Sequence, residues 1–196
     1  VTPKMIIVKC RSNAGYDWGV YHASISPSVL YLQTTDAASS AAGLFNNTAP
    51  TSTVFTLGGA SQTNWGDTNY STFTYVAYCF AEVAGYSKFS SYTGNGSSDG
   101  PFVYCGFRPK FVMWKRTNTS GDGWWMLDSA RNLYNVTNLV ISAQSSNAES
   151  TQTTPVDFLS NGFKLRNGAD GSINASGSTY IFMAFAENPF NYSLAR

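Results

Sequence analysis

One loop of this 196-residue chain combines the kinds of side chain that hold sugars. Among the side chains of residues 61–70 are the amides of Asn64 and Asn69, the carboxylate of Asp67 and the aromatic rings of Trp65 and Tyr70. A pyranose offers C–H faces to aromatic rings and hydroxyls to amides and carboxylates. We therefore predict that these five residues form a ligand-binding site. The alternative is that Trp65 packs over the end of a hydrophobic core.

Residues that could perform catalysis are sparse. His22 is the single histidine, so a Ser–His–Asp or Cys–His arrangement would depend on it, and we expect it on a turn or on the surface. Glu82 and Glu187 end two similar segments, which favours a repeated structural hydrogen bond over the facing carboxylates of a glycosidase. Four other acidic residues are scattered over distant segments: Asp99, Asp128, Glu149 and Asp157. We predict that the protein is not an enzyme.

The composition also argues against other classes of function. The sequence has no Cys/His cluster that could bind zinc. The Gly-, Asn- and Asp-rich segments 95–99 and 167–171 are typical of ordinary turns as well as of calcium-binding loops. No metal or cofactor is therefore predicted. The formal net charge is +1 and only 12% of residues are charged, which excludes the basic surface of a nucleic-acid-binding protein. The longest apolar runs are far shorter than the roughly 20 residues of a membrane-spanning helix.

The elements that must position the loop occur twice in the chain. Segment 3–9 (PKMIIVK) returns 106 positions later at 109–115 (PKFVMWK), and segment 75–82 returns 105 positions later at 180–187. A repeat of this kind indicates a duplicated structural unit. Residues 61–70 lie in the diverged middle of the first copy, so we expect their aromatic rings to have no shared role in folding.

Hydrophobic patterning predicts strands in both copies and almost no helix. Residues 5–10 and 111–115 are nearly continuous apolar runs, which are typical of central strands covered on both faces. Gly-containing turns precede Trp18 and Trp124, so each copy is predicted to open with a hairpin. Asn161-Gly162 between two apolar pairs predicts a further hairpin turn.

Segments 75–81 and 180–186 close the two copies and are the most hydrophobic of the chain, so we expect both in the middle of a sheet. The predicted fold class is all-β, with two tandem homologous β-sandwich units. The first unit covers residues 1–88 and lacks a match to the leading strands of the second, which covers 89–196. We therefore expect the chain to be part of a longer array. One sandwich per unit and one larger shared sandwich both remain open.

Three cysteines cannot all pair with one another, and the repeat argues against any pair. Cys10 aligns with Arg116, and Cys79 aligns with Ala184, so the shared fold requires neither thiol. We predict that both of them and Cys105 are buried or half-buried free thiols, without a disulfide framework.

The second copy resembles a known family. The segments that carry the resemblance are 92–100, 106–113, 125–131, 157–165, 174–181 and 184–190. They resemble the repeat found near the C-termini of tail-fibre and related virion proteins of tailed bacteriophages. In strand order and aromatic content the unit is also similar to jelly-roll sandwiches of the concanavalin A and laminin-G lectin type. The resemblance covers about half of the chain, from Gly85 to its end.

The resemblance implies a virion component, such as a tail fibre or another external appendage, assembled in the host cytoplasm. It implies a homo-oligomer, specifically a homotrimer, that contacts other virion proteins and attaches without catalysis to a carbohydrate or receptor of the host surface. Neither nucleic acid nor membrane is an expected partner. The alternative is a purely structural virion component, such as a fibre, collar or capsid appendage, without a ligand site. A glycan hydrolase is a third interpretation.

The loop hypothesis predicts the behaviour of one variant. Trp65→Ala should weaken binding to a cell surface while the melting temperature stays unchanged, because the ring would contact ligand and not core. Binding and thermal unfolding are measured on the same preparation. A large fall in melting temperature, or loss of solubility, would instead identify Trp65 as a core residue.

Overall fold

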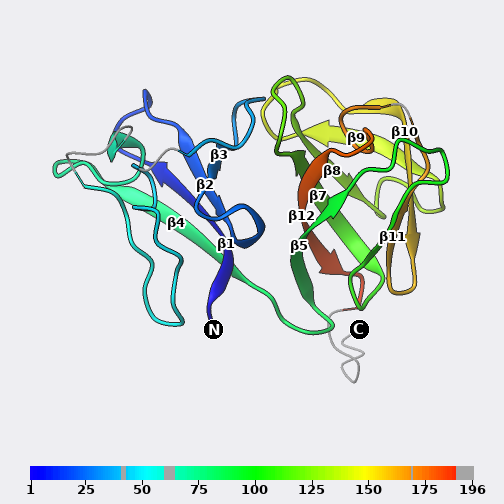
Figure 1. Cartoon of the computed structure of the whole chain (residues 1–196), viewed down its shortest axis with the longest axis horizontal. Helices are drawn as coiled ribbons and strands as arrows, with labels where there is room; N and C mark the ends of the chain where they lie inside the picture. Colours follow the sequence, from blue (N-terminus) through cyan, green and yellow to red (C-terminus); the bar gives the residue numbers. More distant parts are fainter. Residues whose placement is uncertain (41–42, 60–64, 169, 189–196) are drawn as a thin grey trace.

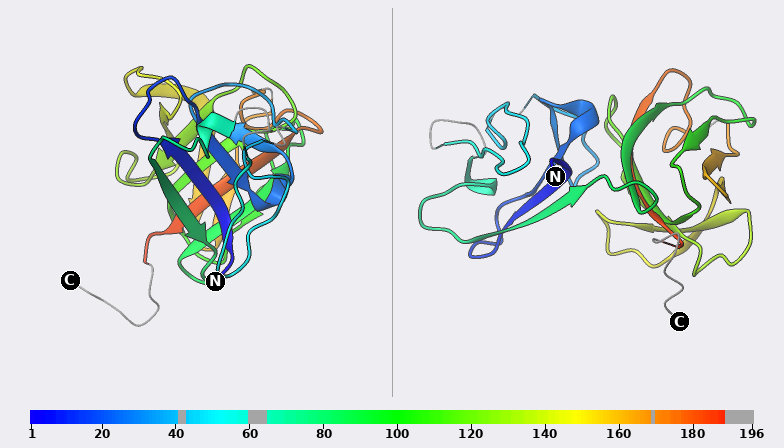
Figure 2. Two further views of the ribbon diagram at one scale, coloured as in Figure 1. Left: turned by 90° about the vertical axis from the view of Figure 1, so that its left-hand side faces the viewer. Right: turned by 90° about the horizontal axis from the view of Figure 1, so that it is seen from below.

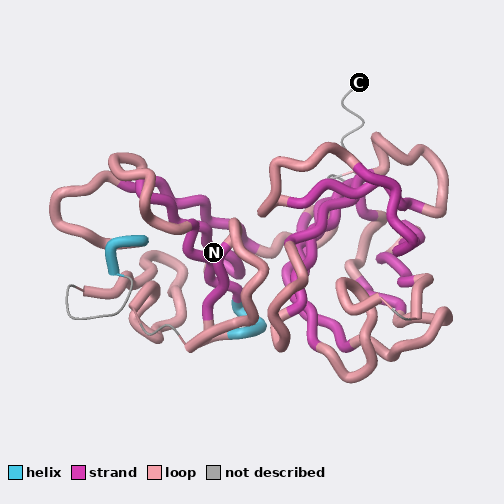
Figure 3. Tube along the Cα trace, turned by 90° about the horizontal axis from the view of Figure 1, so that it is seen from above, coloured by secondary structure: helices cyan, strands magenta, loops and turns pink. Residues whose placement is uncertain are grey.

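In its described residues, the computed structural model contains twelve strands and two short 3-10 turns (Figures 1 and 3). It describes residues 1–40, 43–59, 65–168 and 170–188, without the side chains of residues 65 and 153–155. The first part of the chain contains β1 (Pro3–Cys10), β2 (Trp18–His22), η1 (Ala23–Ile25), β3 (Val29–Tyr31), η2 (Trp65–Asp67) and β4 (Tyr75–Ala81). The second contains β5 (Ser87–Thr93), β6 (Phe102–Tyr104), β7 (Pro109–Arg116), β8 (Trp124–Asp128), β9 (Thr137–Ser142), β10 (Ser150–Leu159), β11 (Gly162–Leu165) and β12 (Thr179–Ala186).

The strands form two antiparallel sheets. The smaller sheet has the order β3-β2-β1-β4, and the larger has the order β5-β12-β7-β8-β9-β10-β11-β6. Seen from below, the larger sheet curls into a near-closed barrel, and the smaller sheet lies beside it (Figure 2). The prediction of an all-β fold is confirmed. The predicted hairpin at Asn161-Gly162 is also confirmed, because Leu159 pairs with Gly162 between β10 and β11.

The strands β7 and β12 are buried on both faces, because they separate two hydrophobic cores. Alternate side chains point into the barrel, among them Trp114 of β7 and Phe182 of β12. The intervening side chains, such as Met113 and Ile181, point toward the smaller sheet. This arrangement confirms the prediction that residues 111–115 form a central strand. It also accounts for their continuous apolar sequence, since each face of the strand meets a core.

The smaller sheet is likewise covered on both faces. Met5 and Ile7 of β1 face the larger sheet and share a core with Trp124. Ile6 and Val8 face the other way, toward Leu44 in the long segment between β3 and β4. The prediction that residues 5–10 form a doubly covered strand is therefore confirmed.

Polar groups join the two sheets as well. The indole Nε1 of Trp124 donates to the Tyr31 carbonyl at 2.9 Å, and the Ala38 N–H donates to the Thr117 carbonyl at 2.7 Å. His22 is fully buried between the two sheets as the last residue of β2, so the expectation of a turn or surface position is wrong. Its Nδ1 accepts from the Ser24 N–H at 3.2 Å, which leaves Nε2 as the protonated nitrogen facing the Phe182 carbonyl at 3.3 Å.

Strand pairing follows the same register in the two halves of the chain. Met5 pairs with His22 as Phe111 pairs with Asp128, a shift of 106 positions for both partners. Cys10 pairs with Tyr75 as Arg116 pairs with Tyr180. Both ladders also have a register shift at the proline that opens the first strand of the pair. The predicted boundary between residues 88 and 89 falls inside β5, and the division into units 1–88 and 89–196 stays a prediction.

The two most hydrophobic segments have different environments. Segment 180–186 lies within β12 between β5 and β7, which confirms its predicted place in the middle of a sheet. The same prediction is wrong for segment 75–81, because β4 pairs only with β1 and forms the edge of its sheet. Apolar character reflects the covered face of a strand and does not report whether a neighbour pairs with its second edge.

All three cysteines are free thiols in the structure. Cys10 and Cys105 are buried, as predicted. Cys79 is exposed, which corrects the expectation that it is at least half-buried. The reason is its place on the edge strand β4.

Among the described residues, no helix has the length and hydropathy needed to span a membrane.

Phe185 tests the packing between the two sheets. Its ring contacts those of Phe80, Phe89 and Phe111 at centroid distances of 6.3, 6.0 and 6.4 Å. Phe185→Ala should lower the free energy of unfolding by about 3 kcal/mol, measured by urea denaturation. Leu133→Ala is the matched control, because Leu133 is 72% exposed and its loss should cost less than about 0.5 kcal/mol. Equal effects of the two variants would contradict the packing.

His22 makes stability dependent on pH. Burial lowers its pKa from 6.5 to about 4. The unfolded chain therefore binds a proton as the pH falls through 6.5, whereas the folded chain does so only near pH 4. The free energy of unfolding should decrease over this interval by up to roughly 3 kcal/mol.

His22→Gln is the matched variant, because its amide can still donate to the Phe182 carbonyl but does not titrate. The difference in unfolding free energy between the parent and this variant, measured at steps from pH 7 to pH 4, should shift in favour of the variant. A difference that does not change with pH would contradict the buried neutral imidazole.

Candidate functional site

The five residues predicted to form a ligand site in the loop lie in different environments in the structure. Asn64 and the side chain of Trp65 lie outside the described residues, and the backbone of Trp65 begins η2. Asp67 is buried, which raises the pKa of its carboxyl, and its Oδ1 accepts from the Asp17 N–H at 2.7 Å.

The last two predicted residues take part in local packing. Asn69 is exposed, and its Nδ2 donates to the Gly58 carbonyl at 2.7 Å. Tyr70 is half-buried and stacks on Phe73 with ring centroids 4.6 Å apart. Together with Asp67, these residues join the loop to three neighbouring connecting segments, at Asp17, Gly58 and Phe73. A ligand site in this loop stays a prediction.

The end of this loop has a counterpart in the second half of the chain. The Tyr75 hydroxyl donates to the Gly66 carbonyl at 2.7 Å and accepts from the Tyr70 N–H at 2.7 Å. The Tyr180 hydroxyl does the same with the Gly171 carbonyl at 2.7 Å and the Ala175 N–H at 2.9 Å. The backbone of residues 66–70 therefore belongs to the shared scaffold. The Tyr70 ring does not, since Ala175 occupies the corresponding place.

The six carboxylates considered for catalysis are all paired with cations. Glu82 lies 2.8 Å from Lys88, and Glu187 lies 2.9 Å from Arg108. Asp128 and Glu149, far apart in sequence, both contact Arg131, at 2.6 and 2.9 Å. The last two pairs are Asp99 with Lys164 and Asp157 with Arg166. The hydrogen bond from Lys164 lowers the pKa of Asp99, which does not suit the raised pKa of a general acid.

Both ring nitrogens of His22 face backbone groups, as described above. No hydrogen bond within the described part of the chain joins this imidazole to a Ser or Cys side chain. The prediction that the protein is not an enzyme stays a prediction. Within that same part of the chain, no three His, Cys, Asp or Glu side chains lie close enough together to hold a metal ion.

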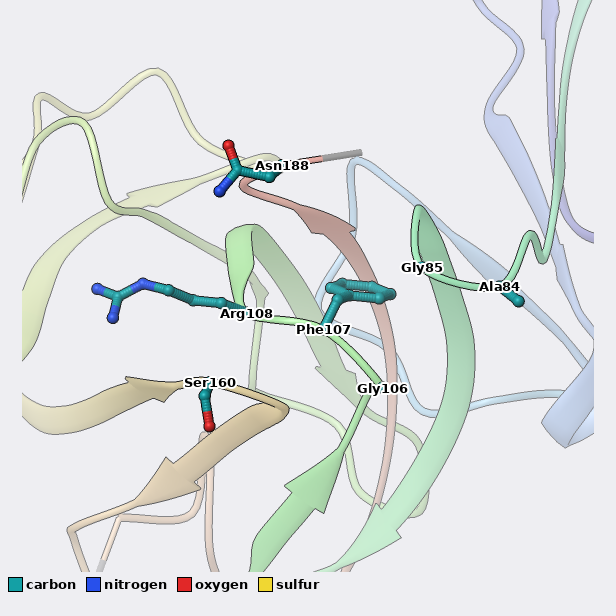
Figure 4. Close-up of a pocket in the computed structure, with 7 residues that line it drawn as sticks. All are labelled: Ala84, Gly85, Gly106, Phe107, Arg108, Ser160 and Asn188. Atoms are coloured by element: carbon teal, nitrogen blue, oxygen red, sulfur yellow. The ribbon is translucent and has the colours of Figure 1, made fainter. Parts of the chain in front are cut away.

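A pocket of about 410 Å³ opens at the junction between the two halves of the chain. We call it the junction pocket, and its lining residues are Ala84, Gly85, Gly106, Phe107, Arg108, Ser160 and Asn188. Figure 4 shows Phe107 between Arg108 and the turn at Gly85, with Asn188 and Ser160 on opposite sides. A pocket of this volume is in the range that holds small ligands.

Three connections and the segment that follows β12, which contains Asn188, bring these residues together. Gly85 lies between β4 and β5, and Gly106 lies between β6 and β7. Their φ angles are +74° and +83°, a backbone conformation that favours glycine. Ser160 lies in the turn between β10 and β11. The next residue, Asn161, fixes this turn to the pocket wall, because its carbonyl accepts from the Cys105 and Gly106 N–H groups at 2.9 and 3.0 Å.

Arg108 is the only charged residue among those that line the pocket. The Glu187 N–H donates to the Arg108 carbonyl at 2.9 Å, and the Arg108 Nε lies 2.9 Å from the Glu187 carboxylate. These two contacts hold Arg108 against the end of β12. Its side chain is nevertheless 41% exposed, so the guanidinium can also donate to a ligand.

Two exposed tyrosines flank the junction pocket. Tyr104 is 62% exposed, and its hydroxyl would lie 3.5 Å from a Cβ atom at Gly106, so its ring borders the pocket wall. Tyr86 directly follows Gly85, is 40% exposed, and contacts Phe185 edge-on with centroids 5.8 Å apart. The pocket thus combines a cation, an amide and a hydroxyl with aromatic surface at its margin.

Sequence reasoning missed this site. Arg108 and Ser160 lie in two different connections, Asn188 follows β12, and no local motif joins the three. One feature of the sequence does point to Arg108. It aligns with Thr2 in the repeat, so the shared fold does not require a charged side chain at this position.

The comparisons with known proteins give one match. Residues 1–189 match a family model described as a domain of unknown function, DUF7483. Neither the curated proteins nor the solved structures contain a match to this chain. Because the family model covers nearly the whole sequence, the chain belongs to the DUF7483 family.

Proposed function

We propose that this protein is a non-catalytic binding module that holds a carbohydrate unit in its junction pocket. One observation carries the proposal: polar groups of Arg108, Ser160 and Asn188 line a pocket that two exposed tyrosines flank. This is the mixture that a sugar needs, since its hydroxyls require hydrogen-bond partners and its C–H faces require apolar contact.

The charge pattern supports binding over catalysis. The carboxylate nearest to the pocket cation is that of Glu187, which pairs with Arg108. Hydrolysis of a glycoside commonly uses two carboxylates that face one bond, with one of them protonated. The described residues that line the pocket include no Asp or Glu. Arg108 instead suits a ligand with acceptor oxygens, including the carboxylate of an acidic sugar.

The biological setting is proposed from the sequence resemblance. We place the protein in a bacteriophage virion, as part of a tail fibre or another external appendage that attaches to a host-surface glycan or receptor. The matching registers of β1–β2–β4 and β7–β8–β12 support descent of the two halves from one duplicated unit of the jelly-roll, concanavalin A-like type. The alternative is a purely structural virion component without a ligand site.

Arg108→Ala tests the proposed pocket. Binding of the purified chain to an array of bacterial surface oligosaccharides identifies a ligand, whose affinity is then measured by calorimetry. Arg108→Ala should weaken that affinity by roughly tenfold to a hundredfold, the cost of losing one charged hydrogen-bond donor. Arg108→Lys should keep part of the affinity, because it retains the charge but not the planar fork.

Tyr104→Ala and Trp65→Ala separate the two candidate sites. If the junction pocket is the site, Tyr104→Ala weakens binding and Trp65→Ala does not. Leu133→Ala is the control for an exposed apolar side chain elsewhere. Binding that Trp65→Ala abolishes and Arg108→Ala leaves intact would transfer the site to the loop. A folded protein that binds no glycan or host cell would favour the structural alternative.

A further inference from the structure

In the part of the chain that the structure describes, the outer edge of β4 has no partner strand. The strand pairs with β1 on one side, from Pro3↔Ala81 to Cys10↔Tyr75. Among the described residues, no backbone hydrogen bond reaches the other edge of residues 75–80. Three successive residues in the middle of the strand, Ala77, Tyr78 and Cys79, are exposed. Figure 1 shows β4 at the margin of the smaller sheet.

In the second half of the chain, the strand equivalent to β4 has a second partner strand on the edge that is free in β4. β12 corresponds to β4 in register, and its second edge pairs antiparallel with β5 from Thr179↔Thr93 to Phe185↔Ser87. With that strand in place, Ile181, Phe182 and Ala184 are almost completely buried. An added antiparallel strand is therefore compatible with this type of strand and with its side-chain pattern.

The other sheet edges have features that hinder further pairing. The outer edge of β3 is occupied, because Val29 and Ser39 exchange backbone hydrogen bonds at 2.9 and 3.0 Å. β5 contains Lys88, and β6 has only three residues. Bridging segments, lysines and short strands are common means of preventing edge-to-edge association. β4, with the sequence YVAYCFA, has seven residues without charge, proline or glycine.

We propose that β4 pairs antiparallel with β4 of a second copy of this chain, around a two-fold axis at Tyr78. In this register Tyr78 opposes itself, Ala77 opposes Cys79, and Tyr75 opposes Ala81. Two identical strands that pair antiparallel give a closed, symmetric dimer. The two small four-stranded sheets then form one continuous sheet across the axis.

The flanking residues argue for a second copy as the partner. The only charge adjoining the strand is that of Glu82, and the proposed register places it opposite Thr74 of the partner copy. Glu82 is moreover paired with Lys88 of its own chain at 2.8 Å. No like charges therefore oppose one another along the paired strands, and the strand is complementary to itself. This inference does not depend on the proposed carbohydrate site.

The solution mass and one variant test the proposal. The full chain should have the mass of a dimer in sedimentation equilibrium. Tyr78→Lys should weaken dimerisation by roughly tenfold or more, because it places two ammonium groups opposite each other. Tyr134→Lys is the control, since Tyr134 is 84% exposed in the connection between β8 and β9. It should leave the mass unchanged.

Cross-linking tests the register without destabilising the fold. Ala77→Cys places a thiol opposite the native Cys79 of the partner copy, so mild oxidation should give a covalent dimer. Ala77→Cys combined with Cys79→Ser should give none. A monomer at all concentrations, a trimer that Tyr78→Lys does not dissociate, or cross-linking that is independent of Cys79 would overturn the proposal.

Discussion

The structure depends on a sheet whose central strands are buried on both faces. β7 and β12 divide the barrel core from the core between the two sheets, so neighbouring side chains in each strand serve different cores. A slip of one residue would exchange the two sets of side chains. It would place Lys115, whose ammonium now donates to the Arg116 and Thr35 carbonyls, on the barrel side. The register is therefore tightly determined.

Because the strand registers are determined by packing, the two halves of the chain can differ in function only through the connections between their strands. The same registers occur in β1, β2 and β4, and the same tyrosine hydroxyl bridge fixes a loop at Gly66 and at Gly171. The halves differ around Arg108, Ser160 and Asn188, in segments that meet at one end of the barrel. A rigid β scaffold with variable connections is a common basis for binding sites.

The sequence predicted the strands well because their apolar runs have direct causes. Continuous runs marked the doubly covered strands, and Asn161-Gly162 marked a hairpin. The position of β4 was not predictable in this way, because Phe80 and Phe185 are equally apolar although only β12 has a second neighbour. The junction pocket was not predictable either. Arg108 and Asn188 are 80 positions apart, and only the fold brings them together.

We propose that the junction pocket, and not the loop at residues 61–70, holds a carbohydrate. The most direct measurement is a two-dimensional amide NMR titration with an oligosaccharide that the protein binds. If the junction pocket holds the carbohydrate, the shifts should be concentrated at Gly85, Gly106, Ser160 and Asn188. Shifts concentrated at residues 61–70, with these four amides unchanged, would contradict it.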